Sequence, residues 1–289
     1  MPDKDLISAA TKLLCVIGYP VEHSASPIMH NAILGDLDLD YVYLAFNVHP
    51  NQLQNALRGL KTIGTVGINV TIPHKNSVIA FLDEIDPLAK KIGAVNAIKL
   101  EGDRLIGRNT DALGAEKSLR DFGFQFTDKK ALILGAGGAS RAVTFALIYE
   151  LAEITIVNRS IARARALVQQ LKNVADTKIN IIDYDHVLIR QELESSHLLV
   201  NTTPVGMFPN IDESPLDNIL LHEDLMVFDI IYNPLETRLI KDAAQLGCKT
   251  LGGLEMLVNQ GALAFEWWTG KKPSTDLMKK KIIEFLGIK

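Results

Sequence analysis

The 289-residue sequence contains only two cysteines and no long apolar run. Cys15 and Cys248 lie far apart and form no Cys-x-x-Cys pair, so buried thiols in a reducing cytosol are expected rather than a disulfide. No apolar stretch reaches the ~20 residues that a membrane-spanning helix needs. Because the N-terminal segment mixes charges of both signs and has no apolar signal core, we expect a cytoplasmic protein without a membrane partner.

A basic region and a metal-binding pattern are also missing. The net charge of −4, without any basic run, argues against nucleic acid as a partner. His23, His30 and His74 do not have the spacing of metal ligands, so no metal is expected. With 47% hydrophobic and 22% charged residues, the chain has the composition of a soluble globular protein long enough for two domains.

Strands and helices alternate along almost the whole chain, which predicts an α/β fold with mostly parallel sheets. The first half reads as three strands, three helices and a hairpin around a Glu-Gly-Asp turn: strands 13–19, 41–48 and 66–72, helices 26–37, 51–60 and 111–122, and hairpin 96–109. The second half supplies the six strands that a doubly wound dinucleotide domain needs: 129–134, 154–158, 179–182, 197–202, 225–231 and 248–252.

Two helices, 254–269 and 273–286, follow the last strand and are expected to pack back onto the first lobe. We therefore predict two lobes with a cleft between them. Residues 1–111 form a substrate-binding catalytic domain, completed by the C-terminal segment 254–289, and residues 112–253 form a Rossmann domain. The sequence leaves open whether the protein is a monomer or a homodimer.

The segment "GAGGAS" (135–140) follows a predicted strand and opens a predicted helix. Gly135 permits a tight turn, and Gly137 lets the backbone approach a pyrophosphate at the helix N-terminus. Ser140 stands where glycine or alanine is usual. In this context the glycine loop predicts dinucleotide binding rather than a turn without a ligand.

The end of the second strand of this domain indicates which dinucleotide binds. An acidic residue there would accept a hydrogen bond from a ribose hydroxyl, but the sequence has Asn158, Arg159 and Ser160, followed by Arg163 and Arg165. Guanidinium groups bind phosphate oxygens in a bidentate manner, so Arg159 favours the 2′-phosphate of NADP(H). Arg165 is expected only to solvate a helix face.

Polar residues also follow strands of the first half. Ser24 and Ser26 precede a helix and are suited to a small carboxylate, although Ser26 followed by proline is also an ordinary helix N-cap. Lys75 lies just beyond a strand that Pro73 ends, and Asp111 begins a helix. These two residues either form a charge-assisted pair that aligns a substrate hydroxyl or are a surface lysine and a first-turn acid, and the residues alone do not decide.

Eight segments, in order along the chain, resemble the shikimate dehydrogenase family: "HSASP", "NVTIPHK", "GAVNAI", "GRNTD", "GAGGAS", "VNRS" with Arg163, "NTTPVGM" and "GGLEMLVNQ". The resemblance covers essentially the whole chain. It implies reversible reduction of 3-dehydroshikimate to shikimate with NADPH, in aromatic amino-acid biosynthesis.

The resemblance also implies a set of site residues. Lys75 and Asp111 would be the catalytic pair. The substrate would be bound by Ser24, Ser26, Thr71, Lys75, Asn96, Asp111, Tyr232 and Gln260. The cofactor would be bound by Gly135, Ala136, Gly137, Gly138, Ala139, Ser140, Asn158, Arg159, Ser160, Arg163, Ile230 and Gly253.

Three alternatives remain from the sequence. The nearest is a quinate or dual quinate/shikimate dehydrogenase that uses NAD. A non-catalytic NADPH-sensing module would keep the glycine loop but would not need Lys75 with Asp111. A folate-linked dehydrogenase of similar two-lobed shape would not require the paired "HSASP" and "NVTIPHK" segments.

Overall fold

The computed structural model of the chain describes residues 7–171, 175, 177–217 and 220–287. The chain forms two compact units: residues 1–110 together with 260–289, and residues 111–259. Each unit contains one six-stranded sheet, so the predicted α/β class is confirmed. Residues 1–6 and 288–289, which the sequence assigns to the first predicted domain, lie outside the described residues.

The first sheet has the strand order β2-β1-β3-β5-β6-β4. Its strands are β1 (Lys12–Gly18), β2 (Tyr41–Asn47), β3 (Gly67–Val70), β4 (Glu84–Ile85), β5 (Ala97–Glu101) and β6 (Arg104–Arg108). β1, β2 and β3 run parallel, as predicted. β5 and β6 form the predicted hairpin, with Gly102 at φ +61 in its turn, a backbone conformation that glycine adopts readily.

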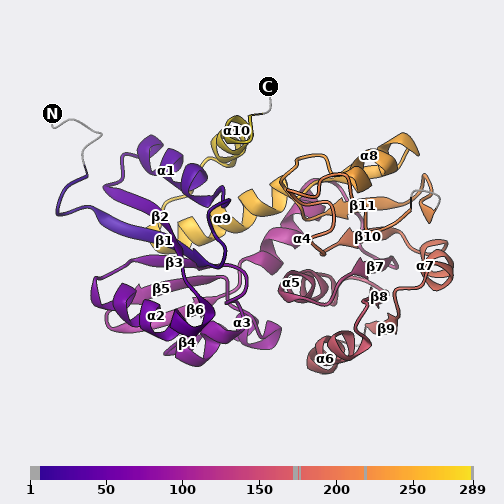
Figure 1. Ribbon diagram of the computed structural model, residues 1–289, viewed down its shortest axis with the longest axis horizontal. Coiled ribbons are helices and arrows are strands. Elements are labelled where there is room, and N and C mark those ends of the chain that lie inside the picture. The colour runs from indigo at the N-terminus through magenta and orange to yellow at the C-terminus, as the bar shows by residue number, and fades with distance from the viewer. Residues whose placement is uncertain (1–6, 172–174, 176, 218–219, 288–289) are drawn as a thin grey trace. The chain divides into compact units, whose positions relative to one another are not determined.

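Helices cover both faces of the first sheet (Figure 1). α2 (Leu53–Thr62) and α3 (Pro87–Ile92) bury apolar side chains with those of Cys15 and Ile68. On the other face lie α1 (Ser26–Asp36), α10 (Thr275–Phe285) and the part of α9 (Leu254–Thr269) that belongs to this unit. Short 3₁₀ helices, Pro50–Gln52 and Ser77–Phe81, complete the unit.

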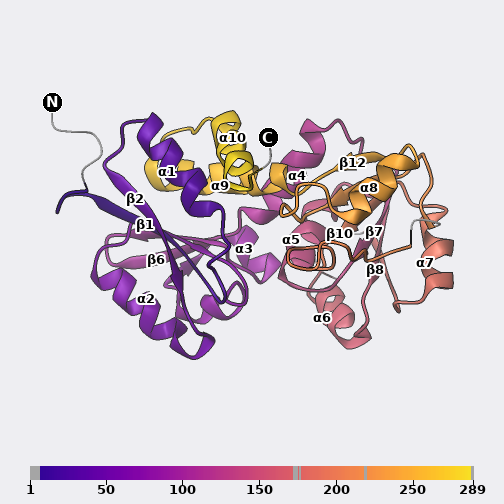
Figure 2. The ribbon, with the colours of Figure 1, turned by 45° about the horizontal axis from the view of Figure 1, so that its top comes forward.

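The C-terminal helices do return to the first unit. α10 packs beside α1, as Figure 2 shows. In α9, the indole of Trp268 donates a hydrogen bond to the Ile98 carbonyl at 2.9 Å, and its ring occupies the space that a side chain at Gly67 would need. The segments 12–110 and 260–285 therefore share one core.

The second sheet has six parallel strands in the order β12-β11-β10-β7-β8-β9, which is the predicted doubly wound arrangement. The strands are β7 (Lys130–Leu134), β8 (Glu153–Val157), β9 (Lys178–Ile182), β10 (Leu198–Asn201), β11 (Met226–Asp229) and β12 (Lys249–Leu251). Strand order reverses between β7 and β10, so their carboxyl ends form the edge where dinucleotides bind in this fold.

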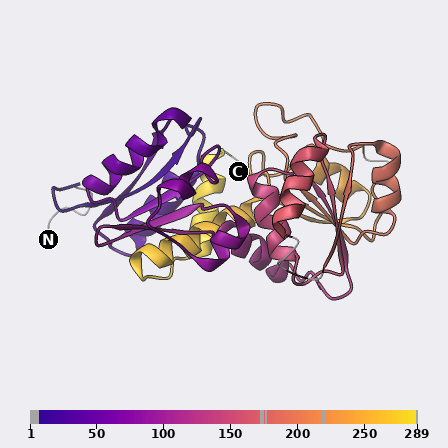
Figure 3. The same cartoon turned by 90° about the horizontal axis from the view of Figure 1, so that it is seen from below.

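Helices lie on both sides of the second sheet, which Figure 3 shows nearly edge-on. α7 (His186–Leu193) and α8 (Arg238–Gln245) pack on the face that carries Leu132, Leu134 and Val227. Because side chains alternate along a strand, Ile133 faces the opposite side, which α5 (Gly138–Leu147) and α6 (Ile161–Leu171) cover. α4 (Asp111–Asp121) packs beside α5.

Candidate active site

The ends of β1 and β3 are joined at one edge of the first sheet. The Thr71 amide donates to the Ile17 carbonyl at 3.0 Å, and the Tyr19 amide donates to the Ile72 carbonyl at 2.9 Å. β1 must end in Gly18, because a Cβ at that position would collide with the methyl group of Thr71. The hydroxyl-bearing Thr71 is thus fixed at a strand end, where α/β proteins bind ligands.

The loop that carries Lys75 is tied to the segment that precedes the hairpin. The Val95 amide donates to the Lys75 carbonyl at 2.8 Å, and the Asn76 carboxamide donates to the Gly93 carbonyl at 2.7 Å. Lys75 itself is half-buried. Its backbone is therefore held by hydrogen bonds from a neighbouring segment, which distinguishes it from a lysine on a loosely attached surface loop.

Ser26 does not cap helix α1. The N-cap position is Ala25, no side-chain capping hydrogen bond is present, and Ser26 is the first helical residue. The interpretation of Ser26 as an ordinary N-cap is therefore wrong. Ser26 is 8% exposed, and the Ser24 hydroxyl oxygen accepts a hydrogen bond from its amide at 3.3 Å. The two serines predicted to bind substrate lie together at the start of α1.

Asn96 and Gln260 come together although they are 164 residues apart in the sequence. The Asn96 carboxamide donates to the Gln260 side-chain oxygen at 3.2 Å and to the Thr110 hydroxyl at 2.9 Å. Its own side-chain oxygen accepts from the Thr110 amide at 2.7 Å. This cluster of amide and hydroxyl groups fixes the last residue before Asp111, which begins α4 in the second unit and is itself buried.

Sequence reasoning gave no role to two buried residues that support this edge. The Asn69 carboxamide donates to the Asn96 carbonyl at 3.1 Å, and its side-chain oxygen accepts from the Tyr43 hydroxyl at 2.6 Å. Asn69 was noticeable as a polar residue within an apolar strand. Tyr43 gave no signal, because a tyrosine in a strand is ordinary.

The glycine loop of the second unit has the geometry that a phosphate needs. Gly135 has φ +107, and a Cβ there would come within 2.7 Å of the Thr202 hydroxyl. Gly137 is the N-cap of α5, and a Cβ there would meet no atom within 4 Å. The loop therefore leaves open space at the N-terminus of a ten-residue helix, which fits a pyrophosphate.

The contacts of Ser140 explain why a serine is accepted at a position where glycine or alanine is usual. Its side chain is buried, and its hydroxyl donates to the Gly135 carbonyl at 2.7 Å. The serine is small enough for helix α5 to approach the sheet, and its hydrogen bond ties the helix to the turn.

The carboxyl end of β8 carries exposed cations and no acid. Asn158 donates from its carboxamide to the Ser160 carbonyl at 2.9 Å, which shapes the turn before α6. Arg159, Arg163 and Arg165 are exposed, and within the described part of the chain none of them forms an ion pair. Charged groups that no carboxylate neutralises suit a phosphate ligand.

Ile230 and Gly253 lie close together, just beyond the carboxyl ends of β11 and β12 in the second sheet. The Gly253 amide donates to the Ile231 carbonyl at 3.1 Å, and a Cβ at Gly253 would collide with the Ile230 carbonyl oxygen. Glycine is therefore required for this approach. Tyr232 follows in the same segment and is partly buried.

A buried carboxylate that sequence reasoning missed organises this edge. Asp229, at the end of β11, is 0% exposed and accepts hydrogen bonds from the Asn201 carboxamide, the Thr237 hydroxyl and the Ile231 amide. Burial raises its pKa from 3.8 to about 6, and these hydrogen bonds oppose the rise. The polar Asn201 at the end of β10 was the available signal.

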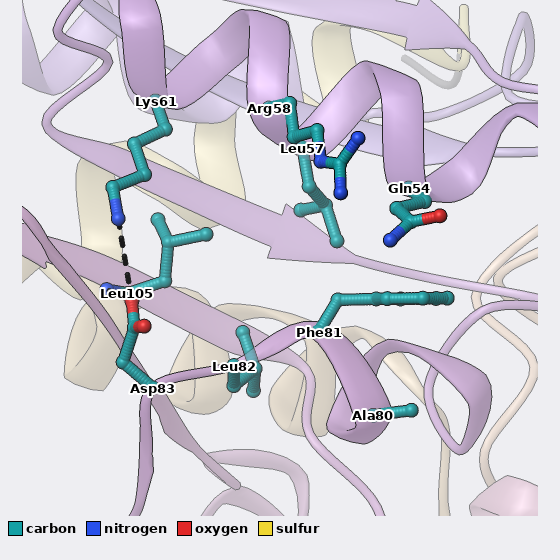
Figure 4. A pocket seen from close by; sticks show the side chains of 9 residues that line it. All are labelled: Gln54, Leu57, Arg58, Lys61, Ala80, Phe81, Leu82, Asp83 and Leu105. Atoms are coloured by element: carbon teal, nitrogen blue, oxygen red, sulfur yellow. Dashed lines mark hydrogen bonds and ion pairs between the residues drawn. The ribbon is translucent and has the colours of Figure 1, made fainter.

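The first unit also contains a hollow of about 330 Å³, which Figure 4 shows between α2, the 3₁₀ helix Ser77–Phe81 and β6. Lys61 and Asp83 point toward each other there, with nitrogen and oxygen 3.6 Å apart. Asp83 also accepts from the Leu105 amide at 2.7 Å, a bond that lowers its pKa. Leu105 pairs with Leu100 near the turn of the hairpin, away from the strand end at Thr71. The charges of Lys61 and Asp83 largely neutralise each other.

The part of the chain that the structure describes contains neither a metal-binding cluster nor a helix able to span a membrane. No group of three or more histidine, cysteine, aspartate or glutamate residues is arranged to hold a metal ion. No helix among residues 7–171, 177–217 and 220–287 is long and apolar enough to cross a membrane. Both cysteines are free and buried.

These features define a class. One chain joins a doubly wound unit, which has a phosphate-type glycine loop at its switch point, to a second α/β unit with an amide- and hydroxyl-rich sheet edge. That combination is the architecture of a two-domain nicotinamide-dependent oxidoreductase.

Comparison with known proteins identifies the family within this class. Residues 16–98 match the shikimate dehydrogenase substrate binding domain, residues 116–230 match shikimate / quinate 5-dehydrogenase, and residues 253–283 match the shikimate 5′-dehydrogenase C-terminal domain. The chain belongs to the shikimate dehydrogenase family.

Individual relatives agree with this assignment. Shikimate dehydrogenase (NADP(+)) of Methanopyrus kandleri is 47% identical, over 97% of this chain and 98% of its own. A crystal structure of a shikimate dehydrogenase in complex with NADP⁺ is 45% identical, with a TM-score of 0.91 and coverage of 97% and 98% of the two chains. The Listeria monocytogenes enzyme, in complex with shikimate and NAD, is 38% identical, with a TM-score of 0.88 and coverage of 95% and 97%.

Proposed function

We propose that this chain is an NADP-dependent shikimate dehydrogenase. It reduces 3-dehydroshikimate to shikimate with NADPH and catalyses the reverse reaction with NADP⁺, as a step toward the aromatic amino acids. The observation that carries the proposal is the hydrogen bond between the side chains of Asn96 and Gln260. Both residues belong to the unit in which Thr71 lies at a strand end. A small hydroxylated acid needs such convergent amide and hydroxyl groups.

Each substrate group has a partner of suited chemistry in the proposal. Ser24 and Ser26 bind the carboxylate through their hydroxyls. Thr71, Asn96 and Gln260 bind the ring hydroxyls, and Tyr232 completes the pocket. The side-chain positions in the first unit support this division, because Ser26 begins α1 and Ser24 lies just before it, while Asn96 and Gln260 share a separate cluster.

The proposed proton path uses Lys75 and Asp111. Bound NADP(H) supplies the hydride chemistry. During reduction, the Lys75 ammonium donates a proton to the oxygen that becomes the new hydroxyl, and during oxidation the neutral amine takes it back. The Asp111 carboxylate accepts hydrogen bonds from Lys75 and from a neighbouring substrate hydroxyl, which orients both.

The cofactor is bound by the second unit in the proposal. The loop formed by Gly135, Ala136, Gly137, Gly138, Ala139 and Ser140 binds the pyrophosphate. Arg159 and Arg163 bind the 2′-phosphate, and Asn158 and Ser160 shape that turn. Ile230 and Gly253 also contact the cofactor. The open space at Gly137 and the exposed arginines support this assignment.

The division of labour follows the predicted domains. In the proposal, residues 1–111 with 254–289 form the substrate-binding catalytic domain, and residues 112–253 form the NADP-binding domain. The two compact units differ from these bounds only in that Asp111 and residues 254–259 belong to the second unit. We place the protein in the cytoplasm as a monomer or homodimer, and its two free, buried thiols suit a reducing compartment.

A direct assay tests the function. Absorbance of the reduced nicotinamide is followed with shikimate or quinate as substrate, each with NADP⁺ or NAD⁺. The proposal expects the highest kcat/KM for shikimate with NADP⁺. No reduction of NADP⁺ by shikimate would refute it, and comparable kcat/KM values for quinate would identify a dual enzyme instead.

A further inference from the structure

The loop that carries Thr71 and Lys75 is anchored by a buried histidine. Of residues 71–77, all of which the structure describes, only His74 is buried, with an exposed fraction of 0%. The proposed function uses Thr71 and Lys75 and leaves His74 without a role. Buried polar groups in proteins are held by hydrogen bonds, so the bonds of His74 show what this residue fixes.

The imidazole of His74 is bonded to the backbone beyond a different strand. Its Nε2 lies 2.7 Å from the carbonyl oxygen of Val48, the residue that follows β2. A carbonyl oxygen can only accept, so Nε2 donates. Nδ1 is also buried and has no hydrogen-bond partner among the described residues. The ring is therefore held by hydrogen bonding through Nε2 alone.

This bond connects two strands that are not neighbours. β1 lies between β2 and β3, and adjacent strands are about 4.8 Å apart, so the loop after β3 is joined to a strand about 10 Å away. Val48 is itself fixed at the end of β1, because its amide donates to the Gly18 carbonyl at 2.8 Å. The carbonyl that His74 holds is thus a fixed point of the sheet.

The backbone of His74 extends this anchor to the rest of the loop. Its amide donates to the Thr71 carbonyl at 2.9 Å. Its carbonyl accepts from the Val78 amide at 2.9 Å and from the Ser77 hydroxyl at 3.2 Å. These bonds close the turn on both sides of His74, so a shift of the imidazole would move the turn that continues into Lys75.

Lys75 lies between this anchor and a second one. His74 precedes the lysine and is held by the segment that follows β2. The Lys75 carbonyl, on the other side of its Cα, accepts from the Val95 amide at 2.8 Å. A residue held at one end can still rotate about that end, whereas anchors on two different segments fix its orientation.

We propose that His74 is a positioning residue for Lys75. Its bond to Val48 fixes the direction in which the Lys75 side chain leaves the backbone, and with it the place of the ammonium at the reacting oxygen of the substrate. The inference rests on the proposed function, in which Lys75 donates the proton. Misplacing a reacting group by about 1 Å can cost about 10²-fold in rate, so one anchor is sufficient to affect catalysis.

Replacement of His74 by two different amides tests the inference. The amide nitrogen of glutamine can take the place of Nε2, whereas that of asparagine corresponds to Nδ1 and does not reach the Val48 carbonyl. His74→Asn should therefore lower kcat for shikimate oxidation by roughly ten- to hundredfold. His74→Gln, which restores the donor, should keep kcat within about threefold of the wild-type value.

The loss in His74→Asn should lie in kcat rather than in KM. The KM for shikimate should rise by less than about threefold, because the Thr71 amide keeps its own bond to the Ile17 carbonyl. Steady-state kinetics of all three proteins measures both constants. Equal losses of kcat in the two variants, or a wild-type kcat in His74→Asn, would overturn the inference.

His222→Asn is the matched control. The His222 ring is also bonded through Nε2 to a backbone carbonyl, that of Leu193 at 3.0 Å, but in the second unit. The same substitution removes the same kind of bond, so Tm should fall in both variants while kcat falls only in His74→Asn. An equal loss of kcat in His222→Asn would mean that lost stability, and not the place of Lys75, lowers the rate, and would overturn the inference.

A double-mutant cycle with Lys75→Ala shows whether His74 acts through the lysine. In the Lys75→Ala background, His74→Asn should lower kcat by less than about a further twofold, because no ammonium remains to be misplaced. Additive effects would overturn the inference. If His74→Asn does not fold, His74→Met, which fills similar space and has no donor, replaces it in the same cycle with the same expected outcome.

The outcomes separate this inference from the function on which it rests. Wild-type protein that does not oxidise shikimate with NADP⁺ refutes the proposed function. Active wild-type protein with an undiminished kcat in Lys75→Ala refutes the proton path and this inference with it. Active wild-type protein, a severe loss in Lys75→Ala and an additive cycle together refute only the role of His74.

Discussion

The two sheet edges predicted to bind ligands are built in different ways. In the first unit, buried side chains hold one another, as Asn96 does with Thr110 and Gln260. In the second unit, the loop beyond β7 consists of glycine, alanine and serine, so it presents mainly backbone atoms. A Cβ at Gly137 would meet open space. The cations at and after the carboxyl end of β8, such as Arg159, are exposed.

The difference matches what each edge is proposed to recognise. A small ring with several hydroxyls is distinguished by the positions of donors and acceptors, and buried side chains hold such positions well. A phosphate offers charge and many equivalent oxygens, so backbone amides at a helix N-terminus and mobile guanidinium groups are sufficient. Substitutions should therefore act through geometry in the first unit and through space or charge in the second.

The largest effect should follow the loss of Lys75. Lys75→Ala should lower kcat by about 10²–10⁴-fold, the usual range for a general acid–base group, with a smaller change in KM. Steady-state kinetics with shikimate and NADP⁺ measures it, and Lys90→Ala, on an exposed part of α3, is the control. If Lys75→Ala kept most of its kcat, the lysine would be a substrate ligand or a surface charge.

Asp229 is an exception to the exposed, backbone-built site of the second unit, because its buried side chain holds the neighbouring backbone in place. Its pKa in the folded state, about 6, lies above the ordinary 3.8, so folding favours the protonated form. The stabilisation from this preference is full below pH 3.8 and is lost as the pH rises through about 6, by up to roughly 3 kcal/mol.

Asp229→Asn should remove that pH dependence. The free energy of unfolding of the variant, relative to wild type, should increase between pH 4 and pH 7 as wild type loses its stabilisation. Urea unfolding at several pH values measures it, and Asp212→Asn, an exposed change, should leave the profile unchanged. Parallel profiles for Asp229→Asn and wild type would show that Asp229 does not titrate in this range.

Arg159 tests recognition by charge. Arg159→Gln should weaken NADP⁺ binding by about 1.5–3 kcal/mol, the value of hydrogen bonds to charged groups, and leave NAD⁺ binding nearly unchanged. Titration with both cofactors measures the effect, and Arg165→Gln serves as the control from α6. An equal loss for the two cofactors would mean that Arg159 stabilises the fold rather than binding the 2′-phosphate.

Substitutions of two glycines in one loop should separate an effect on stability from an effect on cofactor binding. Gly135→Ala should lower stability by about 1–3 kcal/mol, because φ +107 is unfavourable for alanine and its Cβ would press on Thr202. Gly137→Ala should leave Tm unchanged but raise the KM for NADP⁺, because its Cβ enters the space reserved for pyrophosphate. Thermal unfolding without cofactor, together with cofactor kinetics, distinguishes them, and a similar loss of Tm in both variants would contradict this division.

The smallest effect concerns Ser24. Quinate carries an additional hydroxyl beside its carboxylate, and two serines leave little room for it, so wild type should prefer shikimate in kcat/KM. Ser24→Ala should narrow that preference by about tenfold or less, the scale of one hydrogen bond. The ratio of kcat/KM values for the two acids measures it, and an unchanged ratio would remove Ser24 from substrate selection.

Local sequence signals predicted much of the fold. All six strands of the second sheet were expected from their apolar runs, and the hairpin of β5 and β6 was expected from its turn. The two-residue strand β4 and helix α3 were missed, because such short elements show no hydrophobic period. Strand order was not encoded in any single segment and came only from the doubly wound pattern as a whole.

The sequence by itself determined features that depend on neighbouring residues. The turn at Gly135 and the absence of an acid after β8 are visible within a few positions of the chain, because backbone conformation and loop charge are local.

Only the tertiary structure decided which distant residues meet. It brought Gln260 to Asn96, placed the Tyr43 hydroxyl against the Asn69 carboxamide, and buried Asp229 among its three donors. Hydrogen bonds between side chains far apart in sequence depend on strand order and helix packing, which no local pattern specifies. The local signals located the strand ends, and folding selected the side chains that hold them.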